Sequence, residues 1–227
     1  MIFPKVQLGT CYSCKNSSYL SEALCHDCRS ELPTLTTCCL RCGQATAQSI
    51  AVCGQCLKIP PSFDSVVAAY HYKKPVNRLI QSVKQGKNIN IMKALLPELI
   101  NKVGLSYSSN GFPEALVPVP MHWLRLWRRG FNQSYLLAKE LQKALPNSIV
   151  IRELVKRSQV APAQKTLSKS GRKKNVKNGF ELRRKSHFKH IAIIDDVVTT
   201  GATCEAMAVV LKAHGVERVD VWSLARA

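Results

Sequence analysis

A pair of acids followed by a loop rich in threonine and glycine is the segment of this sequence best suited to bind a small molecule. The apolar run 191–194 predicts a buried strand that ends in two carboxylates, and a helix is expected to start near Cys204 and end at Gly215. The segment reads Asp195, Asp196, Val197, Val198, Thr199, Thr200, Gly201, Ala202 and Thr203.

Phosphate is the ligand that such a loop is suited to bind. Backbone N–H groups in the loop and at the start of a helix can donate to a phosphate monoester, and glycine lets the backbone approach it closely. The threonine hydroxyls add donors, while the two carboxylates could accept hydrogen bonds from a ligand's hydroxyl groups. The alternative is an ordinary strand end with exposed acids and a threonine helix cap.

Cysteines form the second chemical pattern, because nine of the ten lie within the first 56 residues. Eight of them form four Cys-x-x-Cys pairs, and the second two pairs repeat the first two at an offset of 28 residues. Two such pairs can present four thiolates to one tetrahedral ion, so we expect structural zinc. The ligands would be Cys11, Cys14, Cys25, Cys28, Cys39, Cys42, Cys53 and Cys56.

Other uses of these cysteines fit the sequence less well. A disulfide framework would need an oxidising compartment, and a redox-active pair would open a helix after a strand. The spacing leaves open whether each repeat holds its own zinc or the pairs interleave. Cys38 falls outside the repeat, and Cys204 is expected to pack inside its helix.

The elements that would position these residues alternate between strand and helix after Pro60 and Pro61. We therefore expect a cysteine-rich zinc module over residues 1–60 and an α/β domain with a mainly parallel sheet over residues 61–227. Strands are expected at 65–70, 116–119, 149–151, 191–194 and 219–222, and helices at 76–83 and 132–145, the latter with Leu137, Leu141, Ala144 and Leu145 on its apolar side.

Length and composition exclude several classes of protein. The 227 residues are 46% hydrophobic, which excludes disorder throughout and fits one domain plus a small module. We find neither the roughly 18 consecutive apolar residues of a membrane span nor a signal peptide, so we expect a cytoplasmic protein without membrane insertion. A formal charge of +19, about +15 with two zinc sites, favours polyanionic partners.

The acidic segment resembles the phosphoribosyl diphosphate (PRPP) signature of type I phosphoribosyltransferases. The resemblance implies that Asp195 and Asp196 hold the ribose 2- and 3-hydroxyls, and that Thr199 to Thr203 hold the 5-phosphate. It also implies Mg2+ bound with PRPP. Arg128 and Arg129 follow the first core strand, where that family binds pyrophosphate, and the alternative for them is an ordinary surface cluster.

Together with the cysteine module, further segments resemble the ComF/GntX family of phosphoribosyltransferase-fold proteins, and GntX-like proteins most of all. They are Val117-Pro118-Val119-Pro120, residues 128–133, Arg157, Gln164, Leu167, Arg172, Asn175 and Phe180. The resemblance implies a role in natural competence or the use of external DNA, with an older link to gluconate use. One departure lies at Lys84, where the family often has an aromatic residue next; Lys84 is either functional or a solvated lysine at a helix end.

Residues 156–189 concentrate positive charge, with twelve Lys or Arg against one acid. The segment predicts salt-dependent binding of single-stranded DNA through Arg172, Lys173, Lys174 and Lys177. Alternatively, it is a flap that closes over PRPP, or simply a solvated loop. Trp123 and Trp127 are expected to pack in a core or hood, with base stacking as the alternative, and His122 is expected to be a loop residue.

These patterns predict a PRPP-binding protein that supports uptake or use of extracellular DNA, with two zinc ions. Its expected partners are PRPP or a related phosphorylated ribose, single-stranded DNA, and DNA-uptake or helicase machinery. The alternative is an active phosphoribosyltransferase of nucleobase or nucleotide salvage. No residue stands out as a general base, so the sequence does not decide whether the protein is an enzyme.

Overall fold

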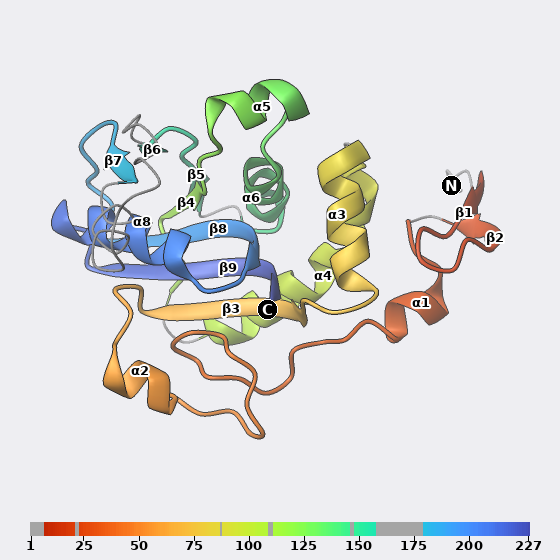
Figure 1. The fold of residues 1–227 in the computed structure, drawn as a ribbon, viewed down its shortest axis with the longest axis horizontal. Coiled ribbons are helices and arrows are strands. Elements are labelled where there is room, and N and C mark those ends of the chain that lie inside the picture. The colour runs from red at the N-terminus through yellow and green to blue at the C-terminus, as the bar shows by residue number, and fades with distance from the viewer. Residues whose placement is uncertain (1–6, 21–22, 87, 109–110, 146–147, 158–178) are drawn as a thin grey trace, which may run out of the picture.

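A five-stranded parallel sheet organises the chain, and two small cysteine-rich ribbons precede it (Figure 1). The computed structural model describes residues 7–20, 23–86, 88–108, 111–145, 148–157 and 179–227. The ribbons contain β1 (Gln7–Thr10), β2 (Ser17–Leu20), α1 (His26–Ser30) and α2 (Gly54–Lys58). Among all the described residues, no helix is both long and apolar enough to cross a bilayer.

The sheet has the strand order β3-β9-β8-β4-β5, and every neighbouring pair is parallel. The carboxyl ends of the strands therefore lie along one edge, where ligands bind in open α/β sheets. Its strands are β3 (Ser65–His71), β4 (Ala115–Pro118), β5 (Ile149–Val150), β8 (His190–Val198) and β9 (Arg218–Arg226). This confirms the expected α/β architecture.

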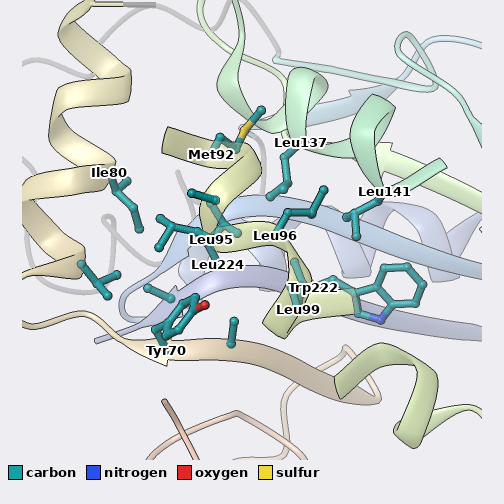
Figure 2. Packing of buried hydrophobic residues seen from close by; sticks show 14 of the residues in the cluster. Tyr70, Ile80, Met92, Leu95, Leu96, Leu99, Leu137, Leu141, Trp222 and Leu224 are labelled. Carbon is teal, nitrogen blue, oxygen red and sulfur yellow. The ribbon is translucent and has the colours of Figure 1, made fainter. Parts of the chain in front are cut away.

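Helices cover both faces of the sheet. Successive side chains of a strand point to opposite faces, so the apolar central strands present an apolar surface on each side. Ala192 and Ile194 pack against α3, α4 and α6, whereas Ile191 and Ile193 pack against α8. The first of these two cores, drawn in Figure 2, brings Leu95 and Leu99 of α4 against Trp222 of β9. The helices are α3 (Val76–Gly86), α4 (Ile89–Ser106), α6 (Gln133–Ala144) and α8 (Ala202–Ala213).

Three short elements complete the described chain, and the sequence had not predicted them. Helix α5 (Trp123–Arg129) follows β4, and strands β6 (Val155–Arg157) and β7 (Phe180–Leu182) form an antiparallel pair beside the sheet. Arg172, Lys173, Lys174 and Lys177, the expected DNA-binding residues, lie outside the described residues. The sequence's expectation for them stays a prediction.

Two expectations differ from the structure. The strand expected at 191–194 continues to Val198, so both acids lie within β8 rather than after it. Their alternating neighbours explain this, because Val197 and Val198 still pack against opposite cores of the sheet. Ala144, expected on the apolar side of its helix, is exposed at the end of α6.

The second ribbon packs against the first strand of the sheet. The Val66 amide donates to the Leu40 carbonyl at 3.1 Å, and Arg41 Nη2 donates to the Pro61 carbonyl at 2.8 Å. Gly43 has φ +71°, and a Cβ there would lie 2.7 Å from Val66 Cγ1, so only glycine fits at this approach. The ribbon thus lies directly against β3, while the proposed boundary at residue 60 stays a prediction.

Candidate phosphoribosyl-binding site and zinc centres

The two acids are held in different ways at the carboxyl end of β8. Asp195 Oδ1 accepts hydrogen bonds from Ser134 Oγ at 3.0 Å and from the Asp196 amide at 2.9 Å. The Asp196 carboxylate is buried, and its Oδ2 lies 2.7 Å from the Lys84 ammonium. Both acids therefore have fixed partners within the protein, which orients them before any ligand is bound.

Ser134 reaches Asp195 because Asn132 fixes the start of α6. The Asn132 carboxamide oxygen caps the helix by accepting from the Ser134 and Tyr135 amides, at 2.9 and 3.3 Å. Its amide nitrogen donates to the Val119 carbonyl at 3.0 Å, just beyond β4. One asparagine thus ties β4 to α6 and aims a hydroxyl at the acidic pair.

Burial and the neighbouring Asp196 carboxylate raise the pKa of Asp195 to about 7, and the hydroxyl of Ser134 opposes this rise only in part. Two adjacent acids with unlike partners titrate as a coupled pair. The site consequently contains a carboxyl group that changes charge near neutral pH.

Lys84 belongs to this site, since it extends from the last turn of α3 to Asp196. Its side chain is 28% exposed, so it is not the freely solvated lysine that the sequence left as an alternative. The ion pair therefore places a positive charge against the Asp196 carboxylate inside the site.

The segment after β8 has the geometry of an anion cradle. Gly201 adopts φ +76° as the N-cap of α8, Thr199 and Thr200 are exposed, and Thr200 Oγ1 accepts from the Ala202 amide at 3.3 Å. The first amides of any α-helix lack partners within that helix, and the helix dipole adds partial positive charge there. The structure therefore presents donors and exposed hydroxyls beside the acidic pair.

Glu205 would repel an anion from the first turn of α8, but its carboxylate is engaged elsewhere. Its two oxygens accept from the Ser62 amide and hydroxyl, at 2.7 and 2.6 Å. These bonds direct the negative charge toward the segment that joins the ribbons to β3, rather than toward the loop.

Arg226 contacts the backbone at the start of the loop, and no pattern in the sequence indicates this role. Its buried guanidinium donates from Nη1 to the Val198 carbonyl at 3.3 Å and to the Thr199 carbonyl. Its Nε donates to the Cys42 carbonyl at 3.0 Å. One side chain thus connects the candidate phosphate loop to a cysteine of the second ribbon, and a cavity of about 220 Å³ lies between them.

Arg157 is electrostatically coupled to the acidic pair through Asp195. Its Nε donates to the Pro120 carbonyl at 3.1 Å, and its guanidinium lies 5.0 Å from the centre of the Phe180 ring. Burial lowers its pKa from the ordinary value, as does the charge of Arg125, while the charge of Asp195 raises it. The guanidinium therefore faces the carboxylates electrostatically; the sequence had indicated Arg157 only through the family resemblance.

Arg128 and Arg129 lie in the last turn of α5. Arg129 Nη1 donates to Gln133 Oε1 at 2.8 Å, and Arg128 is exposed. Within the described part of the chain, neither forms an ion pair with Asp195 or Asp196. Their expected contact with a diphosphate stays a prediction.

The cysteines gather into two separate clusters, which answers the question of partition. One contains Cys11, Cys14, Cys25 and Cys28, the other Cys39, Cys42, Cys53 and Cys56, and the four sulfurs of each lie within 4.8 Å of one another. All ten cysteines are free, so the disulfide alternative is wrong in this structure. Each repeat holds its own cluster, and the pairs do not interleave.

The cluster geometry fits zinc. Four thiolates around a tetrahedral ion with Zn–S bonds of about 2.3 Å stand about 3.8 Å apart. Cys14 and Cys25 Sγ are 3.9 Å apart, and Cys42 and Cys53 Sγ are 3.8 Å apart. The backbone amides of Cys25 and Cys53 donate to the sulfurs of Cys11 and Cys39, at 3.4 and 3.2 Å, and such donors stabilise the charge of metal-binding thiolates. Two structural zinc ions are consistent with this arrangement.

Other singled-out residues have structural places. Cys204 is buried in α8, as expected. Cys38 lies outside both clusters, and its backbone forms an isolated antiparallel β-bridge with Ala45. His122 caps α5 by accepting from the Leu124 amide at 3.3 Å. Trp123 and Trp127 do not pack into a core, because α5 has no buried residue.

Two comparisons with known proteins concern parts of the chain. The double zinc ribbon domain pattern matches residues 1–57. The fold aligns with a purine phosphoribosyltransferase from Pyrococcus horikoshii at 14% identity and a TM-score of 0.36, covering 60% of this chain and 82% of that one.

Relatives match over nearly the whole chain. Competence protein F of Haemophilus influenzae is 34% identical over 225 residues, covering 96% of both chains. The DNA utilization protein YhgH of Escherichia coli is 35% identical over 221 residues, 96% of this chain and 97% of that protein. Competence protein ComFC of Bacillus subtilis is 29% identical over 192 residues, 80% of this chain and 75% of that one. The chain belongs to the ComF/YhgH (GntX) family.

Proposed function

We propose that the end of β8 binds PRPP with Mg2+, and that the protein uses this site in the handling of DNA. The observation that supports the proposal most directly is the acidic pair at the carboxyl end of a central parallel strand, followed at once by a loop that opens α8. A ribose with adjacent 2- and 3-hydroxyls and a 5-phosphate needs acceptors for the hydroxyls and donors for the phosphate.

Each part has a separate task in this proposal. The carboxylates of Asp195 and Asp196 accept hydrogen bonds from the ribose hydroxyls, and residues 199–203 donate to the 5-phosphate. Lys84 holds the Asp196 carboxylate in place by an ion pair. Mg2+, bound with the diphosphate, would neutralise that group, and the guanidinium of Arg157 could do the same.

The names of the relatives support the second half of the proposal, since they include competence and DNA utilization proteins. We propose that this chain likewise contributes to the use of DNA, binds it as a single strand, and works with uptake or helicase machinery. The reducing cytoplasm keeps cysteine thiols free to bind zinc, and we place this role there.

A transferase reaction is the second candidate function. In it, the bond from the anomeric carbon to the diphosphate breaks as an acceptor bonds to that carbon, and pyrophosphate leaves with the electron pair. The favouring observation is the pKa of Asp195, raised to about 7 by burial and by Asp196, because a group that titrates near neutrality suits proton transfer.

A direct test is titration of the zinc-loaded full-length protein with PRPP and Mg2+ by calorimetry. Hydrogen bonds to charged groups contribute about 1.5–3 kcal/mol, so Asp195→Asn and Asp196→Asn should each weaken binding about tenfold or more. Glu217→Gln, which removes an exposed carboxylate remote from the loop, should bind as the wild type does. Equal affinity in all variants would refute the site; pyrophosphate release with an added base would identify a transferase.

A further inference from the structure

Helix α5 exposes an aromatic surface that the proposed PRPP site does not use. The side chains of Trp123, Leu124 and Trp127 are 61%, 49% and 82% exposed, and Trp127 neighbours both others because it lies four positions from Trp123 and three from Leu124. The third tryptophan of the chain, Trp222, is fully buried in the sheet. Large exposed aromatic residues grouped in this way mark a contact surface.

Positive charge surrounds this aromatic face. Arg125, Arg128 and Arg129 lie on the same helix, which contains no acid. Beside it lies a cavity of about 390 Å³, lined by Trp123 together with Arg152, Lys156, Arg157 and Arg183, and by Glu153 as its one carboxylate. An aromatic ring and four cations thus line the same hollow.

The carboxylates near the cavity leave its cations available. Glu153 pairs with Arg183 at 2.8 Å and Glu181 with Lys156 at 3.1 Å, and all four side chains are about half exposed. Exposed ion pairs of this kind contribute about 1 kcal/mol or less, so a phosphate can replace the carboxylate at little cost.

One residue of the cavity wall is hydrogen-bonded to the element that supports the proposed ribose site. Asn132, which caps α6 and so positions Ser134 on Asp195, contributes to the cavity wall, as does Arg157. A chain that occupies the cavity would therefore contact a residue that supports the acidic pair.

We propose that the aromatic face of α5 and the basic cavity beside it bind single-stranded nucleic acid, with bases stacked on Trp123 and Trp127 and phosphates bound by Arg152, Lys156 and Arg183. The proposal deepens the DNA-handling part of the proposed function and rests on it. Alternating aromatic and cationic contacts match the bases and phosphates of one strand.

Single strands fit this surface better than other polyanions. In a duplex the base faces are already stacked on one another, so they are not free to cover tryptophan. A membrane surface also attracts an amphipathic basic helix. However, α5 spans only 7 residues, and Trp123 borders a hollow lined with cations rather than a convex apolar face.

The tryptophan distribution supplies the test. With Trp222 buried, quenching of intrinsic fluorescence by a thymidine 20-mer reports on α5. Stacking is worth about 1–3 kcal/mol per base, so Trp123→Ala plus Trp127→Ala should weaken binding at least tenfold and abolish the quenching, while Phe at both positions should retain most of the affinity. Arg152→Ala plus Lys156→Ala should make the slope of log affinity against log salt concentration less steep. Lys58→Ala plus Lys93→Ala, which removes equal charge from α2 and α4, should change this slope less.

Three results would overturn the proposal. They are unchanged oligonucleotide affinity in the double Trp→Ala variant, tighter binding of a 20-bp duplex than of the single strand, and tryptophan-dependent binding of phosphatidylglycerol vesicles without binding of the oligonucleotide. Asp195→Asn plus Asp196→Asn separates this proposal from the PRPP site. That variant should lose binding of PRPP and keep binding of the oligonucleotide. If the PRPP proposal is wrong, the PRPP titrations of the wild type and of this variant should both be flat, while the oligonucleotide still quenches the fluorescence of each.

Discussion

At the scale of single residues, the two adjacent acids differ because each has a different partner. Asp196 faces the Lys84 ammonium and Asp195 faces a hydroxyl, and burial together with the Asp196 carboxylate raises the pKa of Asp195 to about 7. A folded-state pKa above the unfolded value means that the native state binds the extra proton, so this carboxyl makes the protein less stable as pH rises from about 4 to about 7. Hydroxyl groups of a ligand that donate to the Asp195 carboxylate would offset this loss of stability.

The pH dependence of PRPP binding tests the role of Lys84. Binding to the Asp195 carboxylate should strengthen as pH rises through about 7, and removal of the nearby positive charge of Lys84 should raise the pKa of Asp195 further. We expect Lys84→Ala to move the midpoint of affinity against pH upward by about one unit.

The controls for that experiment are Lys84→Arg, which keeps the charge, and Lys93→Ala, which removes an exposed lysine of α4. PRPP has a phosphate that itself titrates near pH 6, but this contribution is common to all variants. A midpoint identical in Lys84→Ala and wild type would show that the ion pair does not tune the site.

The acids and the threonine loop could be predicted from sequence because they are consecutive. Ser134 could not, since it contacts Asp195 across 61 residues of sequence. The same holds for Arg226, which lies 184 residues from Cys42 and follows no local pattern. Side chains that support a site from other elements are determined by the packing of the whole fold.

At the scale of elements, the second ribbon is connected to the candidate phosphate loop. Arg226 joins the Cys42 carbonyl to the Val198 and Thr199 carbonyls, whereas the first ribbon packs against the core beside α3 and α4. The two zinc centres should therefore differ in their effect on the ligand site, although their cysteine spacing is identical.

We expect Cys53→Ser to weaken PRPP binding about tenfold and Cys25→Ser to change it by less than about twofold, because only the second cluster is connected to Arg226. Zinc released by each variant, measured with a metallochromic dye, verifies that one site was lost in each case. Arg226→Ala should reproduce the Cys53→Ser effect with both zinc ions retained. Equal weakening by the two cysteine variants would contradict this coupling.

Element prediction succeeded for several segments with strong apolar periodicity, but it missed α4, an 18-residue helix with seven buried residues and Pro97 in its interior. Helix α3 and strands β3, β8 and β9 follow from regular apolar spacing, although β8 extends past the acids. The short pairs β1–β2 and β6–β7 carry mixed polar residues, so only pairing with a partner strand defines them. Helix α5 buries no residue, and thus lacks a core-facing stripe to recognise.

At the scale of the whole molecule, one buried carboxylate joins elements from both ends of the main domain. Asp220 accepts from Ser65 Oγ at 2.7 Å and from Tyr107 Oη at 2.6 Å, and it lies 2.7 Å from His190 Nε2 and 3.0 Å from Arg218 Nε. It thereby connects β3, β8 and β9 with the end of α4.

Asp220→Ala should lower the free energy of unfolding by about 3–5 kcal/mol, because it leaves several buried polar groups unpaired. Burial alone would raise the pKa of Asp220, but its hydrogen bonds with His190, Tyr107 and Ser65 and the charge of Arg218 lower it. Its contribution is therefore present above about pH 4 and is lost as pH falls through the folded-state pKa. Urea unfolding at pH 7 and pH 3 measures both effects, with Glu217→Gln as control; a variant as stable as wild type at pH 7 would refute the network's role.

The place of β9 in the sheet also governs how the protein can form on the ribosome. Among the described strands, β3 has β9 as its one sheet partner, and Ser65 lies 155 residues before Asp220. Each ribbon draws its four cysteines from a short local segment, so both can take up metal early in translation. The strand β3 must then wait, with its hydrogen-bonding edge open, until residues 218–226 have emerged. Nascent chains are thus exposed to mispairing and aggregation for most of their synthesis, and the last strand to appear is the one that closes the sheet.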